Sequence, residues 1–392
     1  MINKEKLLKS LEGKGAIAKS SSLKKLIKLE NVSPELVPVQ KELVPLHFTS
    51  NVYYSLYSPT MCAYFAHKSG CFAVAINDYA TVKSYKELKK ACEILSLPYA
   101  CGYHVECKPL FGEKKAVVYG YGVAYNDYKK LSLDLNEVRL NKQKGILKII
   151  QNVNKVISSY GIFIPVKLVI KNKNNVITEK NVAKVLAEIL VKKFGKDEEL
   201  LQFLKNVLKI DSCECDIRFI KEQENSYFEE DLAKVIYTKC VLLKSKDKKD
   251  DCKKFIDINN KYGIISAYKI DVKSFDEKEL KIIVDTLIEN GFNAVTFKCN
   301  GIDKEELNKI VDYFMERGML AISLYRMGLP RQLMPTFEES SQLYLNSLAV
   351  IGNAISVNCD KDDGLFGINT VNNCESLKKR VELFSNIVKG RK

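Results

Sequence analysis

Short apolar runs alternate with helically spaced segments over most of the chain. Cys71–Ile76 is a continuous apolar run, which is typical of a strand buried on both faces. Tyr85–Leu95 follows with helical spacing, and Tyr99–Val105 and Ala116–Val123 are further predicted strands. After residue 264 the pattern returns, with strands predicted over 264–268, 294–297 and 320–324 and helices over 280–288 and 305–314. This alternation predicts an α/β fold with a parallel sheet or barrel.

The middle third of the chain has a different pattern. From residue 133 to about 243 helical spacing dominates, as at Ile146, Ile149, Ile150 and Val153. The sequence therefore predicts one barrel that a helical insertion interrupts. The predicted parts are an N-terminal helical extension over 1–43, a first barrel portion over 44–132, the α-helical insertion over 133–245, and a second barrel portion over 246–392.

The composition describes a globular protein with a large core. The chain has 392 residues, of which 46% are apolar. No apolar run approaches the roughly 20 residues that a membrane-spanning helix needs, and residues 1–28 are charged and amphipathic. We therefore expect a cytoplasmic protein with no membrane association. The twelve cysteines are scattered without a Cys-x-x-Cys pair, which predicts reduced, buried thiols and no common structural zinc site.

The formal net charge of +14 raises the question of nucleic-acid binding. Only seven of the basic residues are arginines, and the lysines are spread along the chain. The densest basic run, 244–254, alternates with Asp247, Asp250 and Asp251. Dispersed lysine is typical of a solvated surface, whereas base and phosphate contacts favour arginine. The pattern argues against nucleic acid as a partner, and a nucleic-acid-associated protein is kept as an alternative function.

Several motifs have a recognisable arrangement along the chain. They are His47, the run Tyr57-Ser58-Pro59-Thr60, the predicted strand that ends in Asp78, Glu87-Leu88, Gly102, and the later patches 291–296 and 330–332. Together they resemble the polymerase and histidinol phosphatase (PHP) superfamily, in particular its long bacterial branch with a helical insertion. The resemblance implies a distorted (β/α)7 TIM-like barrel. It also implies metal ions at the C-terminal strand ends and hydrolysis of phosphate esters by a metal-activated water.

Most of the metal ligands that the resemblance implies are replaced in this chain. The second histidine of the His-x-His pair is Thr49, and the Asp-His-Asp cluster keeps only Asp78 before Tyr79 and Ala80. The third-strand glutamate corresponds to His104, with Glu106 as the nearest carboxylate. Other ligand positions fall at Tyr121, at Tyr325-Arg326 and at Asn353. Such residues are poor substitutes for imidazole on a transition metal. The main prediction is therefore a catalytically impaired barrel that acts by binding a ligand or a partner.

One alternative is an active enzyme whose site holds a single metal ion. If His47, Asp78 and His104 follow successive strands, adjacent strand ends would bring them together around a single zinc or manganese ion. The chain would then be an active phosphoesterase with that ion as its cofactor. Each residue also has a structural interpretation: the histidine bonded to a buried partner, and Asp78 capping a turn or helix. On the main prediction no cofactor is expected.

The replacements themselves suggest a second kind of site. Tyr79, Tyr121 and Tyr325 take ligand positions, and Arg326 and Arg331 bring positive charge. An aromatic and basic barrel mouth predicts a pocket for a small phosphorylated or planar ligand. The other interpretation is that bulky side chains fill a vacated cavity, because packing penalises voids. The partner predicted from these residues is a small phosphorylated ligand or a protein.

Overall fold

The structure is a computed structural model that describes residues 4–13, 15–32, 43–55, 57–113, 116–170, 176–210, 228–244, 249–327 and 341–391. The chain forms two compact units. The first comprises residues 1–135 and 249–392, and the second comprises residues 136–248. The bounds of the second unit differ by three residues at each end from those of the predicted insertion, 133–245. The N-terminal helices belong to the first unit.

The first unit is built on one sheet with the order β7-β6-β5-β4-β3-β2-β1-β8. Its strands are β1(His47–Phe48), β2(Val74–Tyr79), β3(Tyr99–Cys107), β4(Ala116–Val123), β5(Ile265–Lys269), β6(Ala294–Phe297), β7(Leu320–Ser323) and β8(Arg326–Met327). β8 follows β7 after two residues and pairs with β1, so one chain segment joins both ends of the sheet. If β7 and β8 of this segment are counted as one position, the strands occupy seven positions. The predicted α/β TIM-like barrel is confirmed, with the helical insertion between β4 and β5.

The predicted parallel arrangement holds for every strand pair except those that β4 makes. β4 runs antiparallel to both β3 and β5, while the other pairs are parallel. The reason is the connection from β3 to β4, which spans only residues 108–115. A parallel return needs a crossover of a dozen or more residues, whereas a short loop suits an antiparallel neighbour. The barrel is therefore mixed.

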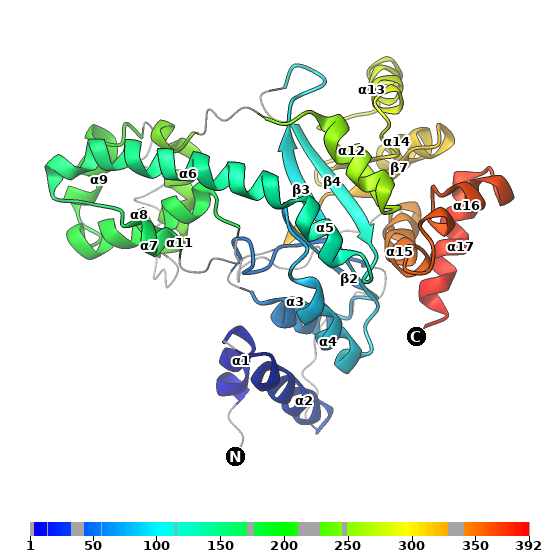
Figure 1. The fold of residues 1–392 in the computed structure, drawn as a ribbon, viewed down its shortest axis with the longest axis horizontal. Coiled ribbons are helices and arrows are strands. Elements are labelled where there is room, and N and C mark those ends of the chain that lie inside the picture. Colours follow the sequence, from blue (N-terminus) through cyan, green and yellow to red (C-terminus); the bar gives the residue numbers. More distant parts are fainter. Residues whose placement is uncertain are drawn as a thin grey trace. The chain divides into compact units, whose positions relative to one another are not determined.

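Helices link the parallel strands and cover the outside of the sheet (Figure 1). α4(Tyr85–Leu95) is a typical case, since Leu88, Ala91, Cys92 and Leu95 form one buried stripe. The other helices of this unit are α1(Lys4–Glu12), α2(Ala16–Val32), α3(Pro59–Lys68), α5(Tyr128–Asp134), α12(Cys252–Lys261), α13(Glu277–Glu289), α14(Lys304–Glu316), α15(Ser341–Ser356), α16(Ile368–Asn373) and α17(Leu377–Lys389), with the short η3(Lys361–Asp363). None of the helices in the described ranges combines the length and apolar character needed to cross a membrane.

The second unit is helical, as its spacing indicates. Over the described residues of this unit, its elements are α6(Asn136–Ile157), η1(Ser158–Tyr160), α7(Val166–Val169), α8(Glu179–Phe194), α9(Glu198–Asn206), α11(Phe228–Lys239) and η2(Val241–Leu243). The apolar faces of these helices form a core of their own, which includes Ile150, Leu186 and Leu232. A buried ion pair, Lys142 Nζ to Glu179 Oε1 at 2.6 Å, joins α6 to α8. The insertion therefore has the hydrophobic core of a separate domain.

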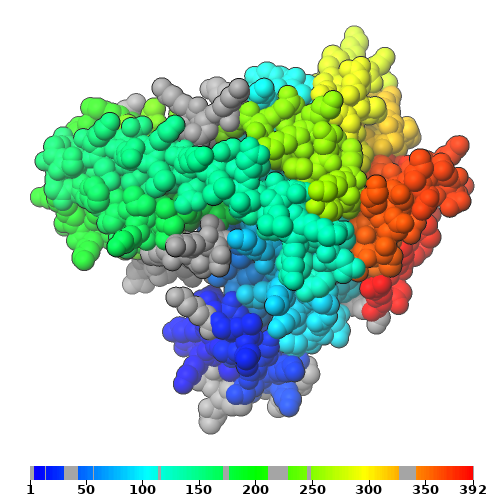
Figure 2. All heavy atoms as spheres, viewed as in Figure 1, coloured from blue at the N-terminus to red at the C-terminus, as the bar shows by residue number. Residues whose placement is uncertain are grey.

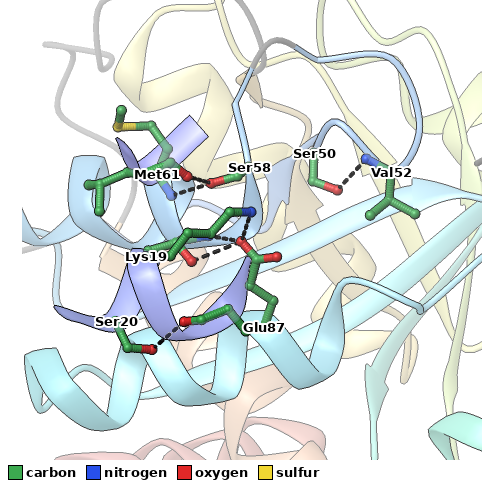
Figure 3. A network of polar contacts seen from close by, with 10 residues as sticks. Lys19, Ser20, Ser50, Val52, Ser58, Met61 and Glu87 are labelled. Atoms are coloured by element: carbon green, nitrogen blue, oxygen red, sulfur yellow. Dashed lines mark hydrogen bonds and ion pairs between the residues drawn. The ribbon is translucent and has the colours of Figure 1, made fainter. Parts of the chain in front are cut away.

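The two N-terminal helices pack on α3 and α4 through a set of polar contacts. Glu87 Oε1 accepts hydrogen bonds from Lys19 Nζ at 2.7 Å, from Thr60 N at 3.2 Å and from Thr60 Oγ1 at 2.8 Å (Figure 3). The Ser58 hydroxyl caps α3 and donates to the carbonyl of Leu11 at 2.6 Å. Figure 2 shows α1 and α2 in blue against the helices that follow in the chain. The run 57–60 and Glu87 therefore have a structural role: they attach the N-terminal helices to α3 and α4.

Removing the Glu87 carboxylate is expected to weaken this attachment. Glu87→Ala leaves the amide of Thr60 and the largely buried ammonium of Lys19 without their shared acceptor, and should lower the free energy of unfolding by about 2 kcal/mol. The matched control is Glu93→Ala on the same helix, whose i,i+4 pair with Lys89 is exposed. Urea unfolding of both variants measures the difference. Equal effects would contradict a special role for Glu87.

Candidate functional site

Strand alternation decides which side chains face the inside of the barrel. Strand pairing aligns Asn77 with Gly102 and Tyr79 with His104, and antiparallel pairing aligns His104 with Tyr119. These residues therefore share one face of the sheet. Gly102 shows that the face is crowded, since a Cβ at this position would meet Asn77 Nδ2 at 2.7 Å and the carbonyl of Gly120 at 2.5 Å. Tyr103, on the other face, reaches out to Asn259 of α12.

His47 lies on the inner face in contact with two tyrosines of β4. Its Nε2 and the Tyr121 hydroxyl share a hydrogen bond, and its ring meets those of Tyr119 and Tyr121 edge-on at 5.2 and 5.4 Å between centroids. The two tyrosine rings stack at 5.5 Å. His47 is 2% exposed and Tyr121 is 1% exposed. His47 also opens β1 rather than following it, which corrects its predicted place at the end of a strand.

His104 is held by a second group of contacts. Its Nδ1 lies 3.1 Å from Asn77 Oδ1, and its ring stacks on Tyr119 at 5.4 Å. Tyr79 and Tyr53 meet the same imidazole edge-on at 5.6 and 5.5 Å. His104 was predicted at the end of the third strand, but β3 continues through Cys107. The inner face near these two histidines is thus filled with packed rings.

Asp78 is on the opposite face of the sheet from Asn77 and Tyr79. Its carboxylate oxygens accept from the backbone N and from Oγ of Ser50, each at 2.7 Å. Cys101, which lies on the outer face of β3, and Cys62 of α3 are its electrostatic neighbours. Burial raises the pKa of Asp78 to about 6, while the hydrogen bonds from Ser50 and Ser84 act in the lowering direction. Asp78 therefore orders the turn after β1 from the outer side.

The side chains present do not fit a multinuclear metal site. His47 and His104 face inward and are each hydrogen-bonded to another side chain, whereas Asp78 faces outward. The three residues therefore do not converge on one point. Glu106 shares the face of His104, but its carboxylate is paired with Lys249. In the described parts of the chain, no group of three or more His, Cys, Asp or Glu side chains is placed to hold an ion.

The residues of the predicted pocket for a phosphorylated or planar ligand lie in different parts of the structure. Tyr79 and Tyr121 lie in the same aromatic cluster: Tyr79 contacts the ring of His104, and the rings of His104 and Tyr121 both stack on Tyr119. Tyr325 is half-buried between β7 and β8, and the backbone of Arg326 pairs with His47. Arg331 lies outside the described residues. Asn353 is part of α15 and bonds to the carbonyls of Gly122, near the end of β4, and Gly263, just before β5. Because β4 is antiparallel to β5, this is the end of the barrel opposite the C-terminal ends of the parallel strands.

Two residues of this cluster were not identified from the sequence. Tyr119 contacts both imidazoles, and Asn77 bonds to His104. Tyr53, which the sequence already placed near the replaced ligand positions, also contacts His104. Asn77 also has a buried Nδ2 with no hydrogen-bond partner among the described residues. Tyr119 could have been predicted to belong to this cluster, because it lies two positions from Tyr121 in the same strand and therefore shares its face.

Comparison with known proteins gives two structural likenesses. No family model matches this sequence, and no curated protein matches it. One similar solved structure is provisionally described as a metal-dependent phosphoesterase from Bifidobacterium adolescentis; it has 13% identity and a TM-score of 0.47, over 73% of this chain and 87% of that one. Another is an amidohydrolase from Chromobacterium violaceum, solved with sulfate and no metal; it has 14% identity and a TM-score of 0.49, over 75% and 92%. Likenesses of this size carry no information about substrate or reaction.

Proposed function

We propose that this chain is a divergent PHP-type barrel that has lost metal-dependent phosphoester hydrolysis and acts by binding a ligand or a protein partner. The observation that carries the proposal is the cluster of His47, Tyr119, Tyr121, His104 and Tyr79 on the inner face of the barrel. Hydrolysis by a metal-activated water needs several ligands for each ion and an open coordination position. Here aromatic rings contact both imidazoles, and a hydrogen bond engages each of them.

The charge of the inner face supports the same proposal. Metal-dependent hydrolases gather carboxylates around their cations. Glu106, which lies two positions after His104 on the same face of β3, has its carboxylate paired with Lys249. The outward direction of Asp78 removes the remaining acidic residue of the motif from the inner face. A small phosphorylated or planar ligand remains the proposed occupant of the barrel mouth, because tyrosine rings and arginines suit such groups.

The proposal predicts a protein that folds without a metal. Untagged protein purified without a chelator is expected to contain far less than one equivalent of zinc, manganese or iron by elemental analysis. Added Mn²⁺ or Zn²⁺ should produce no chelator-sensitive hydrolysis of p-nitrophenyl phosphate. The opposite result is one equivalent of metal that is lost in His47→Ala and His104→Ala. His67→Ala is the matched control, because His67 is exposed on α3.

A further inference from the structure

Two cysteines that are distant in sequence meet inside the first unit. Cys107 ends β3 and Cys252 opens α12, and their sulfur atoms are 2.7 Å apart. Both thiols are free, and the residues are 1% and 2% exposed. A disulfide bond has a sulfur–sulfur length of about 2.0 Å, so the sulfur atoms need to approach by only about 0.7 Å.

The backbone around both cysteines is held in place by other contacts. Lys108 N donates to the carbonyl of Asp250 at 2.9 Å, and Cys107 and Asp250 form a parallel β-bridge. The residues just before this bridge, Glu106 and Lys249, form an ion pair. Cys252 Sγ also donates to the carbonyl of Lys108 at 3.3 Å. The two thiols are therefore kept together by the fold of the surrounding segments as well as by their own contact.

We propose that Cys107 and Cys252 form an intramolecular disulfide when the protein meets a peroxide. In the first step the thiolate of one cysteine attacks a peroxide oxygen, the O–O bond breaks, and a sulfenic acid and one water form. In the second step the other thiol displaces water from the sulfenic sulfur and the S–S bond closes. The two thiols lose two electrons and two protons in total, and hydrogen peroxide is reduced to two waters.

The environment of the pair makes this reaction slow. The hydrogen bond with Cys252, and then burial, raise the pKa of the Cys107 thiol. Because the thiolate is the reacting form, a raised pKa slows attack on an oxidant. Hydrogen peroxide is small enough to suit a buried pair. These properties describe a structural crosslink that forms under sustained oxidation, and they differ from those of an exposed, fast redox sensor.

The position of the pair determines what the crosslink would do. Lys249 is the first residue of the first unit after the helical unit 136–248. A bond between Cys107 and Cys252 closes a covalent loop across a sequence separation of 145 residues, which contains β4, α5 and the whole helical unit. It would fix the returning segment to the end of β3. Long loops give large losses of unfolded-state entropy, so the oxidised form is expected to have the higher Tm.

The test is peptide mapping of the full chain after treatment with hydrogen peroxide. Remaining thiols are alkylated under denaturing conditions, and the unreduced digest is analysed by mass spectrometry. The expected product is a peptide that links Cys107 to Cys252, with a Tm about 5 °C above that of reduced protein. Dithiothreitol added to the denatured oxidised protein should reverse the link. Cys71→Ser, a similarly buried control, should keep the linked peptide, whereas Cys252→Ser should lose it.

The wild-type digest decides the proposal even if Cys252→Ser fails to fold. Recovery of Cys107 and Cys252 as separately alkylated peptides after prolonged peroxide treatment would overturn it and leave a hydrogen-bonded thiol pair only. Links confined to other cysteines, such as an intermolecular bond through the exposed Cys359, would overturn it as well. A linked peptide without a rise in Tm would overturn the inferred stabilising role of the crosslink.

Discussion

A Gly352→Ala substitution is expected to lower the free energy of unfolding by about 3 kcal/mol or more. Gly352 lies in α15 where this helix crosses α17. A Cβ at this position would lie 2.2 Å from the carbonyl oxygen of Phe384, 2.9 Å from its carbonyl carbon and 3.2 Å from its Cα. All three atoms belong to the backbone, so rotation of a side chain cannot relieve the clash. The helices must separate.

Two opposing effects determine the size of this change. Alanine is the better helix former by about 1 kcal/mol, which would stabilise an open helical position. Separation of α15 from α17 would disturb the buried side chains of Val381 and Phe384 and also the contacts of α15 with the barrel, among them Asn346 Nδ2 to the carbonyl of Ala321 at 2.8 Å. The clash is therefore expected to outweigh the gain in helix propensity.

Thermal and urea unfolding would measure the effect of Gly352→Ala. The matched control is Gly390→Ala at the end of α17, where φ is −71° and an added Cβ would meet Asn386 O at an ordinary 3.4 Å. The control should change stability by less than about 0.5 kcal/mol. A Gly352→Ala protein as stable as the control would mean that α15 and α17 do not approach this closely.

The sequence allowed the strands of the barrel to be predicted because buried parallel strands form continuous apolar runs. Val74–Tyr79 and Ala294–Phe297 lie within or next to runs recognised by that pattern. The direction of β4 was predictable in principle, since residues 108–115 are too few for a crossover. The eighth element was not predicted, because Arg326–Met327 has no apolar run and pairs with β1 only when the barrel closes.

The candidate site was harder to predict because it depends on faces and registers. His47, Asp78 and His104 lie within three neighbouring strands, whereas the sequence pattern placed them at the strand ends. Only the register shows that Tyr79 aligns with His104 and that Asp78 aligns with Tyr103. A one-residue change of register reverses the face of every side chain. The convergence of three ligands could therefore not be judged from their positions in the sequence alone.

The stability of the protein is expected to depend on pH through the buried carboxyl group of Asp78. Burial raises its pKa from the ordinary 3.8 to about 6 in the folded protein. Between pH 4 and pH 6 the folded state then holds a proton on Asp78 that the unfolded state has released. Proton linkage requires the contribution of Asp78 to stability to fall as pH rises through this range and to stay constant above it. A shift of about two units corresponds to about 3 kcal/mol.

Asp78→Asn removes this titration and keeps an oxygen that can accept from the amide of Ser50. The stability of Asp78→Asn relative to wild type is therefore expected to improve from pH 4 to pH 7, by up to about 3 kcal/mol. Urea unfolding at pH values between 4 and 7.5 measures it. Asp285→Asn, an exposed substitution on α13, serves as the control and should follow wild type at every pH.

The same experiment distinguishes the two interpretations of Asp78. A carboxylate that serves as a metal ligand is stabilised in its ionised form, so its pKa would lie below 3.8. The free energy of unfolding of wild type would then increase relative to that of Asp78→Asn as pH rises. In the metal-free protein, burial raises the pKa of Asp78 despite the lowering effect of the hydrogen bonds from Ser50, which gives the opposite slope. A slope that favours wild type at neutral pH, and that disappears in the presence of a chelator, would contradict the metal-free barrel that we propose.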